Sequence, residues 1–229
     1  MSVNVFVIGR PGSGKSTAIR QLMRLAEGYS TMRVKDYPIL LEMFKQEQKQ
    51  NKEHKQFHQT DYGGFDVLDF NVLDTALEQL EKCVSNPKTS QKHDIIFIEF
   101  ARDTYEKVFE KFDGALLRNA YFLFIEAELD TCVKRIHKRV SESQKLDHHF
   151  VSNHIMSNYY DKDNWSYMMN NFEGKFGIYN HTTVIYNEGP LELLEIAVEK
   201  FSEVISLEVI RRREVSFKEA SPLESKAFR

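Results

Sequence analysis

The sequence predicts a three-layer α/β fold, in which a parallel sheet of about five strands carries helices on both faces. Short apolar runs rich in β-branched and aromatic residues indicate the buried strands, at 3–8, 29–34, 94–99, 121–125 and 182–186. Segments with helical spacing of apolar residues lie between them, and this alternation is typical of a parallel sheet. The chain has 229 residues, a length that one α/β domain can reach.

Helices are predicted wherever apolar residues recur at intervals of three and four. In chain order, the expected ranges are 15–27, 38–44, 72–84, 104–112, 129–140, 149–160 and 190–205. Gly28 ends the first of these helices, and Pro38 suits the first turn of the second. The stretch 46–55 is polar all round, which leaves two alternatives open: a solvated continuation of the helix, or a mobile excursion.

The charge balance and the apolar runs bound the class of protein. The formal net charge is −3, whereas a nucleic-acid surface usually brings a strongly basic balance, although a local basic groove remains an alternative. No apolar run approaches the roughly 20 residues that span a membrane, so we expect no membrane partner. The chain enters its first strand directly, which leaves no room for a signal peptide. We therefore expect a cytoplasmic protein.

A glycine-rich loop joins the first strand to the first helix. It consists of Gly9, Arg10, Pro11, Gly12, Ser13, Gly14, Lys15, Ser16 and Thr17. The glycines let successive backbone N–H groups point at phosphate oxygens, and the following helix directs its positive end to the same place. Lys15 adds a charge toward the β- and γ-phosphates, and Ser16 offers a hydroxyl to Mg²⁺. This loop predicts a site for a nucleoside triphosphate, with ATP and Mg²⁺ as the expected cofactors.

Two acidic residues are expected at the sheet edge that this loop marks, because ligands of parallel sheets bind beyond the carboxyl ends of the strands. Glu99 ends the strand 94–99, where it would hold Mg²⁺ through water or take a proton from an acceptor hydroxyl. The alternative is a solvated carboxylate. Asp36 follows the second strand and is a candidate general base, or else an ordinary helix N-cap. The sequence leaves open which of the two acids is the base.

Basic residues gather on the predicted helix 129–140. Arg135 and Arg139 lie one turn apart on the same face. Phosphoryl transfer needs cations beside the transferred group, so we predict catalytic roles for both, the alternative being a solvated basic face. The stretch 141–147 is polar and poor in apolar residues, as a mobile lid would be, and the lid is expected over about 139–160.

The order of these motifs resembles the P-loop NTPase superfamily, and within it the small-molecule kinases of the nucleoside monophosphate kinase and uridine kinase type. The resemblance covers roughly 3–205. It implies a nucleotide-kinase-like domain over 1–206, followed by a C-terminal tail over 207–229 that is either disordered or packed back on the domain.

Further segments extend the resemblance to substrate-binding residues. Asp36 and Tyr37 are similar to the acidic-aromatic site after the second strand of uridine kinase-like enzymes, where the acid serves the acceptor hydroxyl. Phe65 and Asp66 are similar to their Phe-Asp-x-Pro segment, which contacts the acceptor, although the proline is absent here. Arg102 resembles the arginine of the acid-arginine pair in deoxynucleoside kinases, where the two residues are adjacent.

The end of the sheet also matches the pattern. Asn187, after the last strand, is similar to the loop that borders the adenine in nucleotide kinases. No adjacent pair of acids follows a strand, and no Asn-Lys-x-Asp is present. Both absences favour a kinase over a motor-type ATPase or a GTPase.

The leading hypothesis is a kinase that moves the γ-phosphate of Mg-ATP to a hydroxyl or phosphate of a small acceptor, with a nucleoside or nucleotide as the expected class. Two alternatives remain. One is a nucleotide-binding switch that hydrolyses slowly and signals to a protein partner. The other is a kinase of polynucleotide 5′-hydroxyls, which would need a basic channel.

Overall fold

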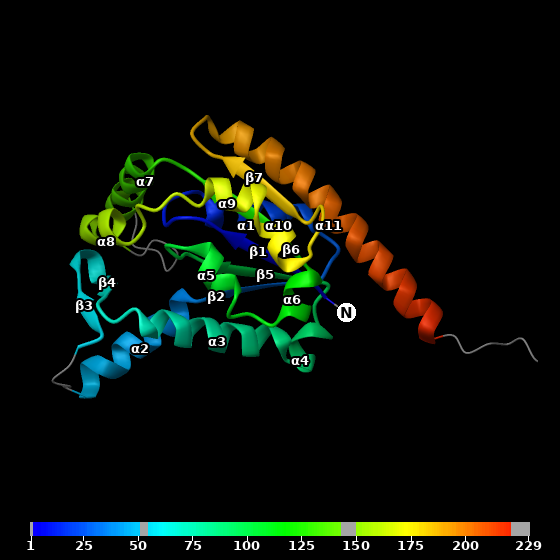
Figure 1. Ribbon diagram of the computed structural model, residues 1–229, viewed down its shortest axis with the longest axis horizontal. Helices are drawn as coiled ribbons and strands as arrows, with labels where there is room; N and C mark the ends of the chain where they lie inside the picture. Colours follow the sequence, from blue (N-terminus) through cyan, green and yellow to red (C-terminus); the bar gives the residue numbers. More distant parts are fainter. Residues whose placement is uncertain (1, 51–54, 143–149, 221–229) are drawn as a thin grey trace, which may run out of the picture.

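The computed structural model describes residues 2–50, 55–142 and 150–220, with side chains as far as Val215. At its centre is a parallel sheet in the order β2-β5-β1-β6-β7. These strands are β1 Val3–Ile8, β2 Thr31–Lys35, β5 Ile95–Phe100, β6 Ala120–Glu126 and β7 Thr182–Tyr186. In-register pairing runs from Val3 beside Ile95 to Ile8 beside Phe100. The predicted fold class is confirmed, because the sheet is parallel throughout and carries helices on both faces (Figure 1).

Alternation along β1 divides the core into two layers. Val3, Val5 and Val7 face α1 (Lys15–Leu25) and α11 (Leu191–Ala220). Phe6 and Ile8 face the opposite layer. That layer contains α3 Asn71–Ser85, α5 Tyr105–Phe109, α6 Gly114–Arg118, α9 Trp165–Asn170 and α10 Phe172–Phe176. Both layers are visible in Figure 1, with α3 below the sheet and α11 above it.

A small antiparallel hairpin was not predicted. It pairs β3 (Phe57–Gln59) with β4 (Phe65–Val67) around a 3₁₀ turn at Asp61–Gly63. Strands of three residues are too short to show an alternating pattern, so the sequence carries no strand signal there. The hairpin buries Phe57 and Phe65 against α2 (Tyr37–Gln50) and α3, as a satellite core at one end of the sheet.

The helix α2 shows the structure of the first half of the polar stretch 46–55, for which a solvated helix and a mobile excursion were the alternatives. It continues through the polar stretch as far as Gln50, whereas 51–54 lie outside the described residues. Glu47 is buried, and its carboxylate accepts hydrogen bonds from the backbone N–H groups of Gln56 (2.6 Å) and Phe57 (3.2 Å). The polar helix therefore supports the start of the hairpin.

Several predicted helices have different bounds. α7 spans Leu129–Glu142, close to expectation, but the helix expected over 149–160 is reduced to α8, Asn153–Asn158. The expected helix over 104–112 forms only its first part, α5, and a single turn, α4, occupies Pro87–Ser90. α9 and α10 were not predicted.

The last helix does not end at Ile205 but continues to Ala220. Val209 is buried in the core beyond the expected end. Arg212 donates to the backbone carbonyls of Ser2 (2.6 Å) and Asn119 (2.8 Å), and Arg213 pairs with Asp94 (2.8 Å). Val209, Arg212 and Arg213 therefore hold this part of α11 against the domain. No helix in the described ranges has the length and apolar character needed to cross a membrane.

Candidate active site

A cavity of about 440 Å³ opens beyond the carboxyl ends of β1, β2 and β5. Nearly all of the predicted site residues line it: Pro11, Gly12, Gly14, Lys15, Ser16, Thr17, Asp36, Tyr37, Phe65, Asp66, Glu99, Arg102, Arg135, Arg139 and Asn187. Gly9 and Ser13 are the predicted residues that do not. The tertiary structure therefore brings the glycine-rich loop, the two strand-end acids and the α7 arginines into one space.

The ammonium of Lys15 lies folded against its own loop. Nζ donates to the carbonyl oxygens of Gly9 (2.8 Å) and Arg10 (2.7 Å). Burial lowers the pKa of Lys15 from 10.5 to about 8, although the nearby Glu99 carboxylate acts in the opposite direction. A cation held by carbonyl dipoles in a partly desolvated position interacts strongly with an incoming anion.

We expect nucleotide affinity to fall as the pH rises above about 8, which is the pKa of Lys15 in the protein without nucleotide. A bound polyphosphate favours the charged ammonium, so binding at higher pH must take up a proton. The dissociation constant for ADP should increase by up to about tenfold per pH unit, until the pKa of the complex is reached. Titration calorimetry in buffers of different ionisation enthalpy measures the uptake, which Lys15→Met should abolish. Affinity that is constant across this range would contradict the expectation.

Gly12 lies where the loop meets the start of α7. Its φ is +83°, and a Cβ added there would stand 2.5 Å from the carbonyl oxygen of Cys132. We expect Gly12→Ala to displace the loop and to weaken nucleotide binding at least tenfold, since a backbone atom cannot move aside as a flexible side chain would. Gly28→Ala is the matched control, because Gly28 has a φ of +96° but nothing within 4 Å. Equal nucleotide affinity in the two variants, measured by calorimetry, would refute the steric argument.

Gly9 and Ser13, which do not line the cavity, help to hold the loop in shape. The N–H of Gly9 donates to the hydroxyl of Tyr105 (2.8 Å), a side chain that is fully buried. Burial raises the pKa of that hydroxyl. The carbonyl of Ser13 accepts from the amide Nδ2 of Asn187 (2.7 Å). Asn187 thus contacts the loop as well as lining the cavity. Tyr105 was missed, because nothing local in the sequence links it to a loop 96 residues away.

Glu99 and Ser16 are direct neighbours. The Ser16 hydroxyl donates to Oε1 of Glu99 at 3.0 Å. Arg33, which was not predicted as a site residue, donates through Nε to Oε2 of Glu99 (3.0 Å) and through a terminal nitrogen to Ser16 Oγ (2.9 Å). The available signal was a basic residue in the middle of a strand of a parallel sheet. A hydroxyl and a carboxylate at this separation are hard oxygen donors, and they fit the preference of Mg²⁺.

Asp36 and Arg102 form a buried ion pair. A terminal nitrogen of Arg102 lies 2.5 Å from Oδ2 of Asp36, and the side chains are 3% and 11% exposed. The guanidinium also donates to the carbonyls of Ala101 (2.6 Å) and Leu73 (2.9 Å). Within the described part of the chain, Oδ1 of Asp36 accepts no hydrogen bond. Asp36 also accepts the Leu40 N–H through its own carbonyl (3.0 Å), so it lies at the start of α2.

The arginines of α7, Arg135 and Arg139, both line the cavity. One terminal nitrogen of Arg135 donates to the carbonyl of Asn187 at 3.0 Å. The other is buried and has no hydrogen-bond partner among the described residues. Arg139 lies close enough for its charge to contribute to the lowered pKa of Lys15. Both residues therefore add positive charge beside the loop.

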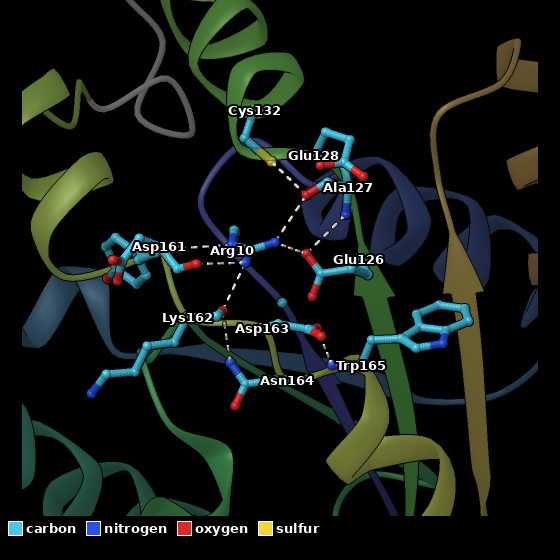
Figure 2. A network of polar contacts seen from close by, with 12 residues as sticks. Arg10, Glu126, Ala127, Glu128, Cys132, Asp161, Lys162, Asp163, Asn164 and Trp165 are labelled. Carbon is cyan, nitrogen blue, oxygen red and sulfur yellow. Dashed lines mark hydrogen bonds and ion pairs between the residues drawn. The ribbon is translucent and has the colours of Figure 1, made fainter.

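A second unpredicted group ties the loop to the segment after α8 (Figure 2). Nε of Arg10 donates to the carbonyl of Tyr160 (2.6 Å), and its terminal nitrogens donate to the carbonyls of Ala127 (3.1 Å) and Lys162 (2.7 Å). Arg10 also forms an ion pair with Glu126, whose pKa burial raises to about 7. Tyr160 lines the cavity, so Arg10 fixes one of its walls.

The expected lid over 139–160 is only partly described. α7 ends at Glu142, 143–149 lie outside the described residues, and α8 follows. Ile155 and Tyr160 from this segment line the cavity. The C-terminal end of the predicted lid therefore borders the site.

Part of the chain matches a known protein family. A family profile described as an AAA domain matches residues 5–157. Similar solved structures include a gluconokinase from Sinorhizobium meliloti 1021, with 13% identity, a TM-score of 0.47 and coverage of 96% of this chain and 98% of that chain. A shikimate kinase from Acinetobacter baumannii has 11% identity and a TM-score of 0.45, over 93% of this chain and 95% of that chain. No curated protein matches.

Proposed function

The chain belongs to the AAA-domain family, and from this premise we propose that it is a phosphotransferase that moves the γ-phosphate of Mg-ATP to a small acceptor. One observation carries the proposal. A single cavity contains both the phosphate loop, with Lys15, and the buried carboxylate of Asp36. A site that only bound or hydrolysed a nucleotide would not need a walled space of this kind beyond the phosphates.

The loop half of the cavity suits the triphosphate. Lys15 and Arg135 supply cationic donors, and the buried unpartnered nitrogen of Arg135 has a hydrogen bond to give. Arg139 adds charge at the same wall. These groups are already in place before the reaction, and preorganised charge of this kind stabilises the negative charge of the transferred group. Ser16 and Glu99 would hold Mg²⁺, which when bound neutralises charge on the β- and γ-phosphates.

The other half of the cavity suits the acceptor. Its walls include Tyr37 and Phe65, whose rings stack with centroids 5.7 Å apart. A cavity lined by both aromatic and charged side chains fits a molecule with a flat ring and hydroxyl groups. This supports a nucleoside or nucleotide as the acceptor. Asp66 and Arg102 supply the polar groups that would orient it.

Asp36 is the better candidate for the general base. Glu99 would already be committed to Mg²⁺ with Ser16, and its Oε2 also accepts a hydrogen bond from Arg33. Asp36 uses Oδ2 for the pair with Arg102, which leaves Oδ1 to accept the proton of an acceptor hydroxyl. Arg102 thereby orients the base, because it fixes the carboxylate from one side.

The test is a panel of candidate acceptors incubated with the chain and γ-labelled ATP. Nucleosides, nucleotides, sugar acids and polynucleotides with a free 5′-hydroxyl are the arms. Transfer of label to a nucleoside or nucleotide supports the proposal, and transfer to a polynucleotide alone would replace it. Release of phosphate without any acceptor, stimulated by a protein partner, would instead support a switch.

A further inference from the structure

The helix α11 carries apolar residues on two opposite sides. Its inner side packs into the core through Leu194, Val198, Phe201, Ile205 and Val209. Its outer side exposes Leu193 (59%), Ile196 (50%), Leu207 (67%) and Ile210 (46%). At 3.6 residues per turn, the two sets lie roughly half a turn apart around the helix. A helix that is apolar on both sides usually has a partner on each.

The outer side follows a heptad pattern. Leu193 and Ile196 occupy one pair of a and d positions, and Leu207 and Ile210 occupy the pair two heptads later. Lys200 and Glu203 occupy the a and d positions of the heptad between them. Both charged residues are exposed, and neither forms an ion pair within the described part of the chain. The seam covers about 27 Å of helix, at about 1.5 Å per residue. Figure 1 shows α11 along the outside of the molecule, with its C-terminal part projecting beyond the sheet.

We propose that this seam binds α11 of a second copy of the chain in antiparallel orientation. In that register, Leu193 meets Ile210 of the partner subunit, and Ile196 meets Leu207 of the partner subunit. Lys200 then lies opposite Glu203 of the partner subunit, and the two-fold axis repeats this pair. The apolar and the charged positions are therefore self-complementary along the whole seam.

The Lys200–Glu203 pair favours this antiparallel register over a parallel pairing and over a shifted antiparallel pairing. A parallel pair would place Lys200 against Lys200 of the partner subunit and Glu203 against Glu203 of the partner subunit. An antiparallel pair shifted by one heptad would bury each charge against Leu or Ile. Polar residues at core positions of a coiled coil specify orientation and register in this way. The proposal is independent of the phosphotransfer reaction, because no residue of the seam lines the cavity.

The test measures the mass of the full chain by light scattering over a range of concentrations. We expect the wild type to reach twice its chain mass of 26.9 kDa. Lys200→Glu alone or Glu203→Lys alone creates two like-charge contacts per dimer and should weaken association at least about 100-fold. The double variant, Lys200→Glu with Glu203→Lys, exchanges the charges and should restore the dimer. Glu78→Lys makes the same charge change as Glu203→Lys at an exposed side chain of α3, and it should leave the dimer intact.

Two results would overturn the proposal. One is a wild-type chain that stays monomeric at every concentration. The other is a dimer that survives the single changes, or that the double change fails to restore, since either would exclude the antiparallel Lys200–Glu203 pairing. Circular dichroism of each variant distinguishes loss of association from loss of the helix.

Discussion

Lys15→Ala is expected to lower the turnover of phosphoryl transfer by roughly two to three orders of magnitude, the usual cost of losing one preorganised charge stabiliser. The reason is that the Lys15 ammonium is held at the cavity by hydrogen bonds to the carbonyl oxygens of Gly9 and Arg10, so its charge is in place before the reaction. Single-turnover transfer from γ-labelled ATP to an active acceptor measures the effect.

The control for this variant is Lys138→Ala. Lys138 lies on α7, its side chain is 75% exposed, and its ion pair with Glu142 is a surface one. The control should keep nearly full activity and the same melting temperature. Full activity of Lys15→Ala would refute the assignment of the loop to catalysis, whatever its effect on nucleotide affinity.

Arg102→Met is expected to destabilise the fold by about 3–5 kcal/mol, because it leaves the carboxylate of Asp36 buried without its cation. The side chains of this pair are only 3% and 11% exposed, so solvent screens the interaction little. For a chain of this size, the melting temperature should fall by on the order of 10 °C. Differential scanning calorimetry measures the change.

A double variant distinguishes the destabilisation caused by the unpaired buried charge from the destabilisation caused by lost packing. Asp36→Leu combined with Arg102→Met removes both charges, and it should recover most of the stability that Arg102→Met loses. Lys162→Met removes one partner of the more exposed Lys162–Asp103 pair and should cost about 1 kcal/mol or less. Equal destabilisation by Arg102→Met and Lys162→Met would show that burial does not govern the effect.

The strands of the sheet could be predicted because each is a local apolar run. The ranges 3–8 and 182–186 coincide with β1 and β7, and the other strands differ by at most two residues at either end. The hairpin at 57–67 and the length of α11 could not be predicted. Short strands lack a periodic signal, and the second half of α11 depends on contacts such as Arg212 with the carbonyl of Ser2.

The residues around the phosphate loop show the same division. Arg135 and Arg139 could be proposed because one helix sets their spacing. Arg33 and Arg10 could not, because their partners are distant in the chain. Arg33 contacts Glu99, 66 residues away, and Arg10 contacts Tyr160, 150 residues away.

The sequence by itself determined the parallel sheet, the phosphate loop and the edge of the sheet, at the carboxyl ends of the strands, where the acids lie. Each of these depends on backbone preferences and spacing within a few residues. Only the tertiary structure decided that Glu99 is held by Ser16 and Arg33 while Asp36 is held by Arg102. The physical reason is that charge pairing and burial depend on which distant segments meet.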